Sequence, residues 1–252
     1  MRTCVVIPVY NHAQVIGTVT AAVMAHGLHC ILVDDGSTAD CARVLDQLAA
    51  ATPQLVTLLR HPQNRGKGAA VISGMQHAAA TGYSHALQID ADGQHDCADI
   101  PRFVQLAQQH PLAVIAGCPI YDDSVPALRF YARYLTHIWV WINTLSLEIK
   151  DSMCGFRLYP LTPVMRLIST RKIGAHMDFD TEILVRLYWA GSRVINLPTR
   201  VGYPLDGVSH FRAVQDNLLI TRMHAVLFAG MLLRSPRLLA RNLRRHWPRR
   251  QP

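Results

Sequence analysis

Two acidic residues one position apart, Asp90 and Asp92, follow a short apolar run that contains Leu87 and Ile89. Such a run is typical of a buried strand, and Gly93 allows the chain to turn directly after it. Two carboxylates at the mouth of a strand can direct oxygen ligands at one hard divalent cation. The alternative is an acidic turn without a ligand, because Asp and Gly are common in turns. The surrounding elements must decide between these two interpretations.

The elements that would position these acids alternate between strands and helices. Continuous apolar runs rich in β-branched residues are typical of strands buried on both faces of a parallel sheet. Four such runs are expected to be strands, and they occupy residues 3–9, 29–33, 55–59 and 86–89. The helical stretches between them predict a doubly wound, mostly parallel α/β sheet, with later strands at residues 111–117 and 193–197. Ligands of such a sheet bind beyond the carboxyl ends of its strands.

Residues that suit a ligand follow each of the first four strands. In chain order they are Pro8, Tyr10 and Asn11, then Asp34 and Asp35, then Lys67, and finally Asp90 and Asp92. The first turn lacks the G-x-G-x-x-G pattern and residues 65–68 lack the spacing of a P-loop, which disfavours the usual dinucleotide and P-loop sites. A helix that begins there with free amides and two cations still suits an anion. The plainer alternative is solvated charge beside a glycine turn.

Four motifs stand in this order at one per strand end: PVYN at residues 8–11, VDDGS at 33–37, NRGKG at 64–68 and DADGQ at 90–94. Together they resemble the inverting family 2 glycosyltransferases with the GT-A fold. Over residues 1–211 the chain is most similar to the branch that contains the dolichyl-phosphate and polyprenyl-phosphate sugar synthases. The resemblance implies transfer of a sugar, with inversion, from a UDP- or GDP-linked donor to a polyprenyl phosphate or another lipid-linked acceptor.

The resemblance also implies a donor site at the strand ends. The residues that would cradle the nucleotide are Pro8, Tyr10, Asn11, Asp34 and Asp35, and Lys67 would lie near the nucleotide or the sugar. The residues that match the family's D-x-D-x-Q metal motif are Asp90, Asp92 and Gln94, of which Asp92 is the surest ligand. The bound Mg²⁺ or Mn²⁺ would stabilise charge on the nucleoside diphosphate leaving group. Because His12 and Gln14 stand where the family usually has an acid, the nucleotide base stays open.

A later segment, residues 202–212, resembles the mobile G-x-S loop of the family. The resemblance implies that Ser209, His210 and Arg212 fold over the donor diphosphate. His210 would contact a phosphate or the metal, although a single histidine is more often a structural residue.

The acceptor side is expected in an aromatic-rich helical stretch at residues 125–147. Arg129 and Arg133 lie four residues apart and therefore share one face of this helix. Guanidinium groups keep their protons and suit an anionic acceptor phosphate. In the resembling branch an arginine-bearing helix holds the lipid phosphate, so these two residues are the candidates for that role. The alternative is ordinary surface charge on an amphipathic helix.

Residues 151–157 match the family's D-x-x-x-G-F-R segment, and a helix with several carboxylates in its first turn begins near residue 178. Acids there are favourable for structural reasons alone, because they face the positive end of the helix dipole. In a catalytic interpretation, Asp180 or Glu182 is the general base that a hydroxyl acceptor needs. A phosphate monoester, with a second pKa of about 6, is already ionised and needs no base. The sequence leaves both acceptors open.

The basic excess of the chain lies near its C-terminus. The net charge is +8 and the sequence pI is about 9.5. Asp216 is the last acid, and seven arginines stand after Leu233: Arg234, Arg237, Arg241, Arg244, Arg245, Arg249 and Arg250. The sequence therefore predicts a catalytic domain at residues 1–211 and an amphipathic, basic helical tail at residues 212–252 that contacts an anionic membrane surface. Nonspecific RNA binding and a solvated end are the alternatives.

Cysteine usage and hydropathy indicate the compartment. The six cysteines form no C-x-x-C pair and stand mostly among apolar residues, which is typical of reduced thiols in the cytosol. Residues 1–9 lack the pattern of a secretory signal, and no uninterrupted apolar run reaches the ~18 residues that span a bilayer. We therefore expect a cytoplasmic protein that is peripheral on the inner face of the cytoplasmic membrane, without a specific nucleic-acid partner. The oligomeric state is left open.

Two other classes of protein are alternatives to a glycosyltransferase. A nucleotidyltransferase also combines such a sheet with a pair of metal-binding acids, but its glycine-rich, basic loop after the first strand is missing here. A basic lipid-binding module without catalysis would not need four acids at strand ends, namely Asp34, Asp35, Asp90 and Asp92.

Overall fold

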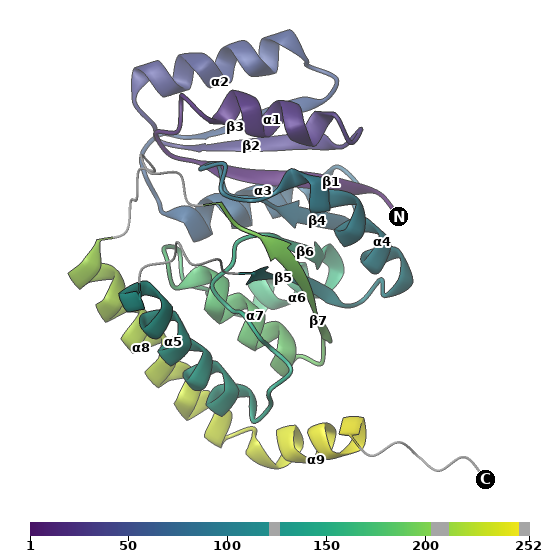
Figure 1. Cartoon of the computed structure of the whole chain (residues 1–252), viewed down its shortest axis with the longest axis vertical. Coiled ribbons are helices and arrows are strands. Elements are labelled where there is room, and N and C mark those ends of the chain that lie inside the picture. Colours follow the sequence, from purple (N-terminus) through teal and green to yellow (C-terminus); the bar gives the residue numbers. More distant parts are fainter. Residues whose placement is uncertain (121–126, 203–211, 247–252) are drawn as a thin grey trace.

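A seven-stranded sheet in the order β3-β2-β1-β4-β6-β5-β7 forms the centre of the molecule, in a computed structural model that describes residues 1–120, 127–202 and 212–246 (Figure 1). Its strands are β1 (Thr3–Val9), β2 (His29–Asp35), β3 (Val56–His61), β4 (His85–Gln88), β5 (Val114–Ile120), β6 (Arg157–Pro160) and β7 (Val194–Arg200). Neighbouring strands are parallel except that β6 is antiparallel to both β4 and β5. The carboxyl ends of the six parallel strands therefore meet at one edge, together with the amino end of β6.

Helices cover both faces of the sheet. On one face lie α1 (Ile16–Met24), α2 (Ala39–Ala51) and α4 (Ile100–Gln109), and a short 3-10 turn, η1 (Cys97–Asp99), precedes α4. On the other lie α3 (Lys67–Ala80), α6 (Leu161–Thr170) and α7 (Phe179–Trp189). Alternate residues of β1 join the two cores, with Val5 on the first face and Val6 on the second. Burial of both strand faces explains why the strand sequences are continuously apolar.

Three further helices lie beside α7, as Figure 1 shows: α5 (Ala127–Thr144), α8 (Ala213–Leu232) and α9 (Ser235–His246). α5 and α8 pack against each other, and α8 contributes Met223 and Leu227 to the core on the α7 side of the sheet. α9 is tied to the body by Asn242, which is buried, accepts a hydrogen bond of 2.8 Å from the Tyr188 hydroxyl and donates to the carbonyl oxygen of Leu145. α8 and α9 are therefore attached to the sheet domain through Met223, Leu227 and Asn242.

The structure confirms the predicted doubly wound, mostly parallel sheet and corrects it in one place. The antiparallel strand β6 was not predicted, because it has four residues and ends in Pro160. It begins at Arg157, the last residue of the D-x-x-x-G-F-R segment, and places that residue between β4 and β5. The fifth strand also begins later than expected, at Val114.

No single helix of the described residues is both long enough and apolar enough to cross a membrane. The pair α8 and α9, bent by 77°, meets that length and composition only when taken together. All six cysteines are free thiols.

Candidate active site

The carboxylates that end β2 shape the turns beside them. Asp34 is buried, and its side chain accepts hydrogen bonds from Arg60 Nε at 2.8 Å and from the Ser37 amide at 2.9 Å. Asp35 is also buried and accepts from the backbone amides of Arg65 at 2.9 Å and Gly66 at 2.8 Å. Asp35 therefore fixes the loop that leads into α3.

The turns after β1 and β2 are joined directly. The amide of Asn11 donates to the Ser37 hydroxyl at 3.1 Å, and the Asn11 side-chain oxygen accepts from the Thr38 amide at 2.8 Å. Asn11 has a φ of +59°, a left-handed conformation that asparagine tolerates better than most residues. Pro8 is buried in β1, and Tyr10 is half-buried beside the turn. The five residues predicted to cradle a nucleotide thus lie at the carboxyl ends of the neighbouring strands β1 and β2 and on the turn after β1.

Lys67, the first residue of α3, lies between two carboxylates. Its Nζ is 2.8 Å from Asp90 Oδ1, 2.9 Å from Asp90 Oδ2 and 2.8 Å from Asp180 Oδ2. Burial alone would lower the pKa of Lys67, but the two carboxylates outweigh it and raise the pKa above its usual value. Burial would likewise raise the pKa of Asp90, but Lys67 and His95 hold it well below its usual range. The Lys67–Asp90 pair is therefore ionised at neutral pH.

Asp180 is held from the opposite side by residues of the sheet. Its Oδ1 accepts a hydrogen bond of 2.9 Å from Gln88 Nε2, and its main-chain carbonyl accepts one from Arg157 Nη1. Gln88 and Arg157 are adjacent in the register of β4 and β6, and both are fully buried. Asp180 thus connects the interior of the sheet with Lys67 at its edge.

Glu182 has different partners one turn into α7. Its Oε1 accepts from Arg186 Nε at 2.7 Å, and its Oε2 accepts from the Gly174 amide at 2.7 Å. The side chain is buried. These contacts join the loop before α7 to the helix itself.

The two acids after β4 differ in their surroundings. Asp90 takes part in the ion pair with Lys67 and packs over Gly155, where a β-carbon would overlap the Asp90 carboxylate. Asp92 is half-exposed, and its Oδ1 accepts from the Gln94 amide at 3.0 Å. Gly93, which stands between Asp92 and Gln94, has a φ of +73°. A residue with a β-carbon would be strained in this conformation.

The donor set of this turn suits a hard cation whose remaining ligands come from elsewhere. Within the described ranges no three His, Cys, Asp or Glu side chains converge as a metal cage. Mg²⁺ and similar cations in nucleotide sites take one or two carboxylates and complete their shell with phosphate oxygens and water. Asp90 and Asp92 offer two such carboxylates at one strand end, so the residues present fit a metal held jointly with a diphosphate.

Arg133, on the predicted acceptor side, is held by a buried carboxylate. Its Nε and Nη2 donate to the two carboxylate oxygens of Asp151, at 2.7 and 3.0 Å. Asp151 also accepts from the amides of Met153 and Cys154. Burial would raise the pKa of Asp151, but the His137 contact and the Arg133 guanidinium hold it well below its usual range. The guanidinium is therefore fixed in one orientation by a permanently charged partner.

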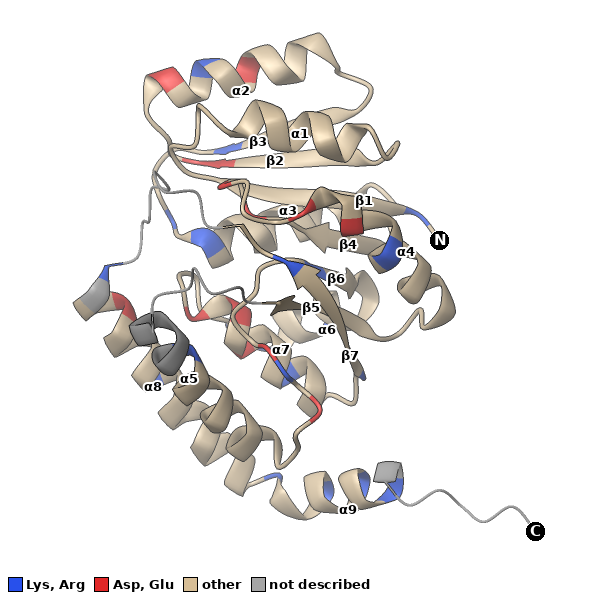
Figure 2. Ribbon diagram, viewed as in Figure 1, with Lys and Arg blue, Asp and Glu red and all other residues tan. Residues whose placement is uncertain are grey.

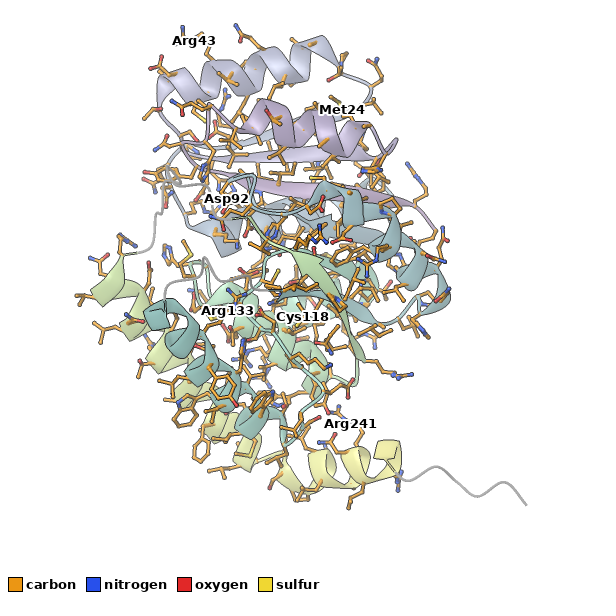
Figure 3. The ribbon with its side chains drawn as sticks, viewed as in Figure 1. Met24, Arg43, Asp92, Cys118, Arg133 and Arg241 are labelled. Atoms are coloured by element: carbon orange, nitrogen blue, oxygen red, sulfur yellow. The ribbon has the colours of Figure 1, made fainter. Side chains whose placement is uncertain are left out.

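A pocket opens beside this ion pair. Its lining includes the side chains of Cys118, Arg133, His137, Lys150 and Asp151. Figure 3 shows Arg133 and Cys118 close together, on the side of Asp92 that faces α5. Pro119, Tyr134 and Trp141 complete the lining, so the pocket combines apolar surface with the basic side chains of Arg133, His137 and Lys150, of which Arg133 is paired with Asp151.

The remaining predicted residues lie apart from these clusters or outside the description. Arg129 lies on α5 one turn before Arg133, and its side chain is outside the described part of the molecule. Ser209 and His210 fall in residues 203–211, also outside it. Arg212 is exposed and begins α8, where its amide donates to Asp216.

The residues that support the candidate site carry weaker sequence signals. Gln88 is a polar residue between the apolar Leu87 and Ile89, and a buried amide in such a place requires a hydrogen-bonding partner. That pattern pointed to a partner without identifying Asp180. Asp151 and Arg157 belonged to a recognised motif, but their contacts with Arg133 and Asp180 depend on the tertiary structure.

Comparison with protein families supports the motif analysis. The family model described as glycosyl transferase family 2 matches residues 4–173. The chain is 29% identical over 214 residues to polyprenol monophosphomannose synthase of Mycolicibacterium smegmatis, covering 78% of this chain and 76% of that protein. It is 34% identical over 176 residues to an undecaprenyl-phosphate 4-deoxy-4-formamido-L-arabinose transferase of Pseudomonas savastanoi, covering 67% of this chain and 50% of the relative.

Solved structures show the same fold. Glucosyl-3-phosphoglycerate synthase from Mycobacterium tuberculosis, in complex with Mn²⁺ and UDP-glucose, has a TM-score of 0.67 at 14% identity and covers 91% of this chain and 78% of that one. A mannosyltransferase from Pyrobaculum calidifontis, in complex with GDP-mannose and Mn²⁺, has a TM-score of 0.61 at 17% identity and covers 92% of this chain and 64% of that one. At these identities the likeness shows the fold, and the expected GT-A architecture is confirmed.

Proposed function

The chain belongs to glycosyl transferase family 2, and we propose that it moves a sugar, with inversion, from a nucleotide-sugar donor to a polyprenyl phosphate or a related lipid-linked acceptor. The observation that carries this proposal is the pair Asp90 and Asp92 at the end of β4, beside Lys67 and the two turns that carry Asn11 and Asp35. The similarity to a polyprenol monophosphomannose synthase and an undecaprenyl-phosphate sugar transferase supports the acceptor class.

On the donor side, the turns after β1 and β2 would bind the nucleoside, and Asp90, Asp92 and Gln94 would hold Mg²⁺ or Mn²⁺ with the diphosphate. The cation, when bound, supplies positive charge to the leaving diphosphate. Lys67 places a second positive charge at the same strand ends. Arg212, with Ser209 and His210, would close over the diphosphate. UDP and GDP both remain candidates, since the structural neighbours include proteins crystallised with each type of donor sugar.

On the acceptor side, the contacts of the α7 acids favour a phosphate over a hydroxyl. A general base must reach the acceptor proton, and a buried carboxylate whose oxygens already face cations or donors is less accessible and less basic. Both oxygens of Asp180 accept hydrogen bonds or face Lys67, and both oxygens of Glu182 accept from Arg186 and Gly174. An ionised phosphate requires no base, and the fixed Arg133 guanidinium, together with Arg129 on the same helix, suits it.

Nucleotide binding separates this proposal from a lipid-binding module without catalysis. We expect calorimetric titration with UDP and GDP to show binding of one of them that strengthens when Mn²⁺ is present. A lipid-binding module predicts no metal-linked nucleotide binding. A nucleotidyltransferase predicts instead that a nucleoside triphosphate is consumed with release of diphosphate.

An exposed apolar face supports contact with a membrane. On α5, Leu135, Ile138, Trp139 and Ile142 are exposed at helical spacing. The Trp139 ring lies edge-on to Phe228 of α8, with their centroids 6.1 Å apart. Soluble proteins rarely leave contiguous apolar surface of this kind without a partner. We propose that this face rests in the interface of the cytoplasmic leaflet, beside the acceptor pocket that α5 lines.

The basic tail contributes less free charge to this surface than its composition suggests. In Figure 2 the arginines of α9 recur in blue along the helix. Arg234 lies 4.9 Å from the Trp189 ring centroid, and Arg241 lies 4.4 Å from that of Tyr188 while donating to the Tyr188 carbonyl. Arg237 and Arg244 are exposed, and each cation near an anionic surface contributes about 1 kcal/mol to binding.

Replacing Ile138 and Trp139 together by serine is expected to weaken binding to anionic liposomes about tenfold or more. The reason is that inserting an Ile or Trp side chain into an apolar phase contributes roughly 1.5–3 kcal/mol. Vesicle co-sedimentation at moderate salt measures the effect. Leu112 is an exposed leucine just before β5, at the opposite end of that strand from the site, so Leu112→Ser is the matched control. Equal binding by the double variant and the wild type would exclude this face.

A further inference from the structure

A chain of polar contacts runs from Gln88 through Asp180 and Lys67 to Asp90. An ion pair between Lys67 and Asp90 alone would not need the first two residues. We propose that Asp180 is a positioning residue, which shares the Lys67 ammonium with Asp90 so that Asp90 remains available to the divalent cation. This inference rests on the proposed function, because it concerns the metal that the donor diphosphate brings to Asp90 and Asp92.

Three elements place this chain of contacts. Gln88 ends β4 and donates to Asp180 Oδ1, Asp180 lies in the first turn of α7, and Lys67 begins α3. The Lys67 Nζ is 2.8 Å from Asp180 Oδ2 and contacts both oxygens of Asp90, at 2.8 and 2.9 Å. The ammonium therefore bridges the two acids.

Asp180 cannot readily leave this position. Its main-chain carbonyl accepts from the fully buried Arg157, and the neighbouring Thr181 hydroxyl donates to the Ser152 carbonyl at 3.1 Å. On its other side Phe179 packs so closely on Gly68 of α3 that a β-carbon at Gly68 would overlap the ring. The start of α7 is thus fixed relative to both β6 and α3.

The negative charge of Asp180 affects how strongly Asp90 can bind a cation. Without the Asp180 carboxylate, Asp90 would be the carboxylate left to Lys67 among the described residues, and the two would form a one-to-one ion pair. A divalent cation would then have to displace the ammonium from Asp90. Removing one negative charge also weakens the electrostatic attraction between the cluster and a cation. The loss is larger in a buried site, where the effective dielectric constant is low. Both effects weaken metal binding.

The contacts separate this role from that of a general base. The Asp180 side chain is 7% exposed, and each of its oxygens already faces a donor, Gln88 or Lys67. A base would act on the acceptor, whereas a positioning residue acts on Asp90. The two roles therefore predict different results when no acceptor is present.

The experiment measures Mn²⁺ binding to the full chain in the presence of the nucleoside diphosphate that binds it, without any acceptor, by electron paramagnetic resonance of free Mn²⁺. We expect Asp180→Asn to raise the Kd for Mn²⁺ about tenfold, since one of two carboxylates on the ammonium is lost. Gln88→Met keeps every charge and the side-chain volume but removes the hydrogen bond that orients Asp180. It is expected to raise the Kd severalfold.

Asp178→Asn is the matched control, because it removes a carboxylate two residues away on the same helix end, where the side chain accepts from the His176 amide. Its Kd should remain within about twofold of the wild-type value. If Asp180→Asn does not fold, Gln88→Met carries the test. Wild-type Kd values in the Asp180 and Gln88 variants would overturn the inference and leave the proposed function intact. A wild-type chain that binds no Mn²⁺ with any nucleotide would instead overturn the proposed function.

Discussion

Replacing Asp92 by alanine is expected to reduce metal-dependent sugar transfer by at least about a hundredfold while leaving the fold intact. A divalent cation contributes several kcal/mol to stabilising a charged leaving group, and each 1.4 kcal/mol is about a factor of ten in rate. Asp92 is half-exposed and takes part in none of the ion pairs found among the described residues. Its loss therefore removes a ligand without removing a structural contact of comparable size.

Initial rates at saturating Mn²⁺, together with the thermal midpoint of unfolding, measure both parts of this expectation. Asp96→Ala is the control, because Asp96 is an exposed acid four residues later that caps η1 through the Ala98 amide. Full activity in the Asp92 variant would contradict the assignment of the metal site. Loss of activity accompanied by unfolding would contradict the view that Asp92 is dispensable for stability.

Replacing Arg133 by glutamine is expected to raise the KM for the lipid acceptor about tenfold to a hundredfold. A hydrogen bond to a charged group contributes roughly 1.5–3 kcal/mol, and the guanidinium is held at the pocket by Asp151. The affinity for the nucleotide should stay unchanged, because Arg133 lies on α5 rather than on the turns of β1 and β2. A titration of acceptor at fixed donor separates KM from kcat.

A control must show that the rise in KM does not come from the loss of an arginine–aspartate ion pair in general. Arg102→Gln breaks a more exposed arginine–aspartate contact, in which Arg102 Nη1 lies 2.5 Å from Asp99, on α4 and away from the pocket. It should leave the acceptor KM unchanged. An unchanged KM in the Arg133 variant, or an equal rise in both variants, would remove Arg133 from the acceptor site.

The sequence predicted that the candidate residues would lie together, because strand ends converge in a parallel sheet. Asn11, Asp35, Lys67 and Asp90 each follow a recognisable apolar run, and the fold brings those ends to one edge. What the sequence did not predict is which carboxylate meets which donor. Asp35 was expected at a nucleotide, and in the structure it also holds the amides of the loop before α3.

The missing details arise from contacts that no local pattern encodes. β6 is too short to produce a periodic signal, yet it places Arg157 under Asp180. The arginines after Leu233 appear in sequence as one basic tail. In the structure Arg234 and Arg241 pack on Trp189 and Tyr188, because a guanidinium stacks favourably on an aromatic ring.

The identity of the acceptor is the central claim, and the bond formed in the product tests it most directly. Purified protein, Mn²⁺ and polyprenyl phosphate would be incubated with a panel of radiolabelled nucleotide sugars, and the lipid extract would be treated with mild acid. We predict label in the lipid fraction from one donor, dependent on Mn²⁺, and released by mild acid as a sugar phosphodiester is. Acid-stable labelled lipid, or no labelled lipid from any donor in the panel, would contradict transfer to a polyprenyl phosphate.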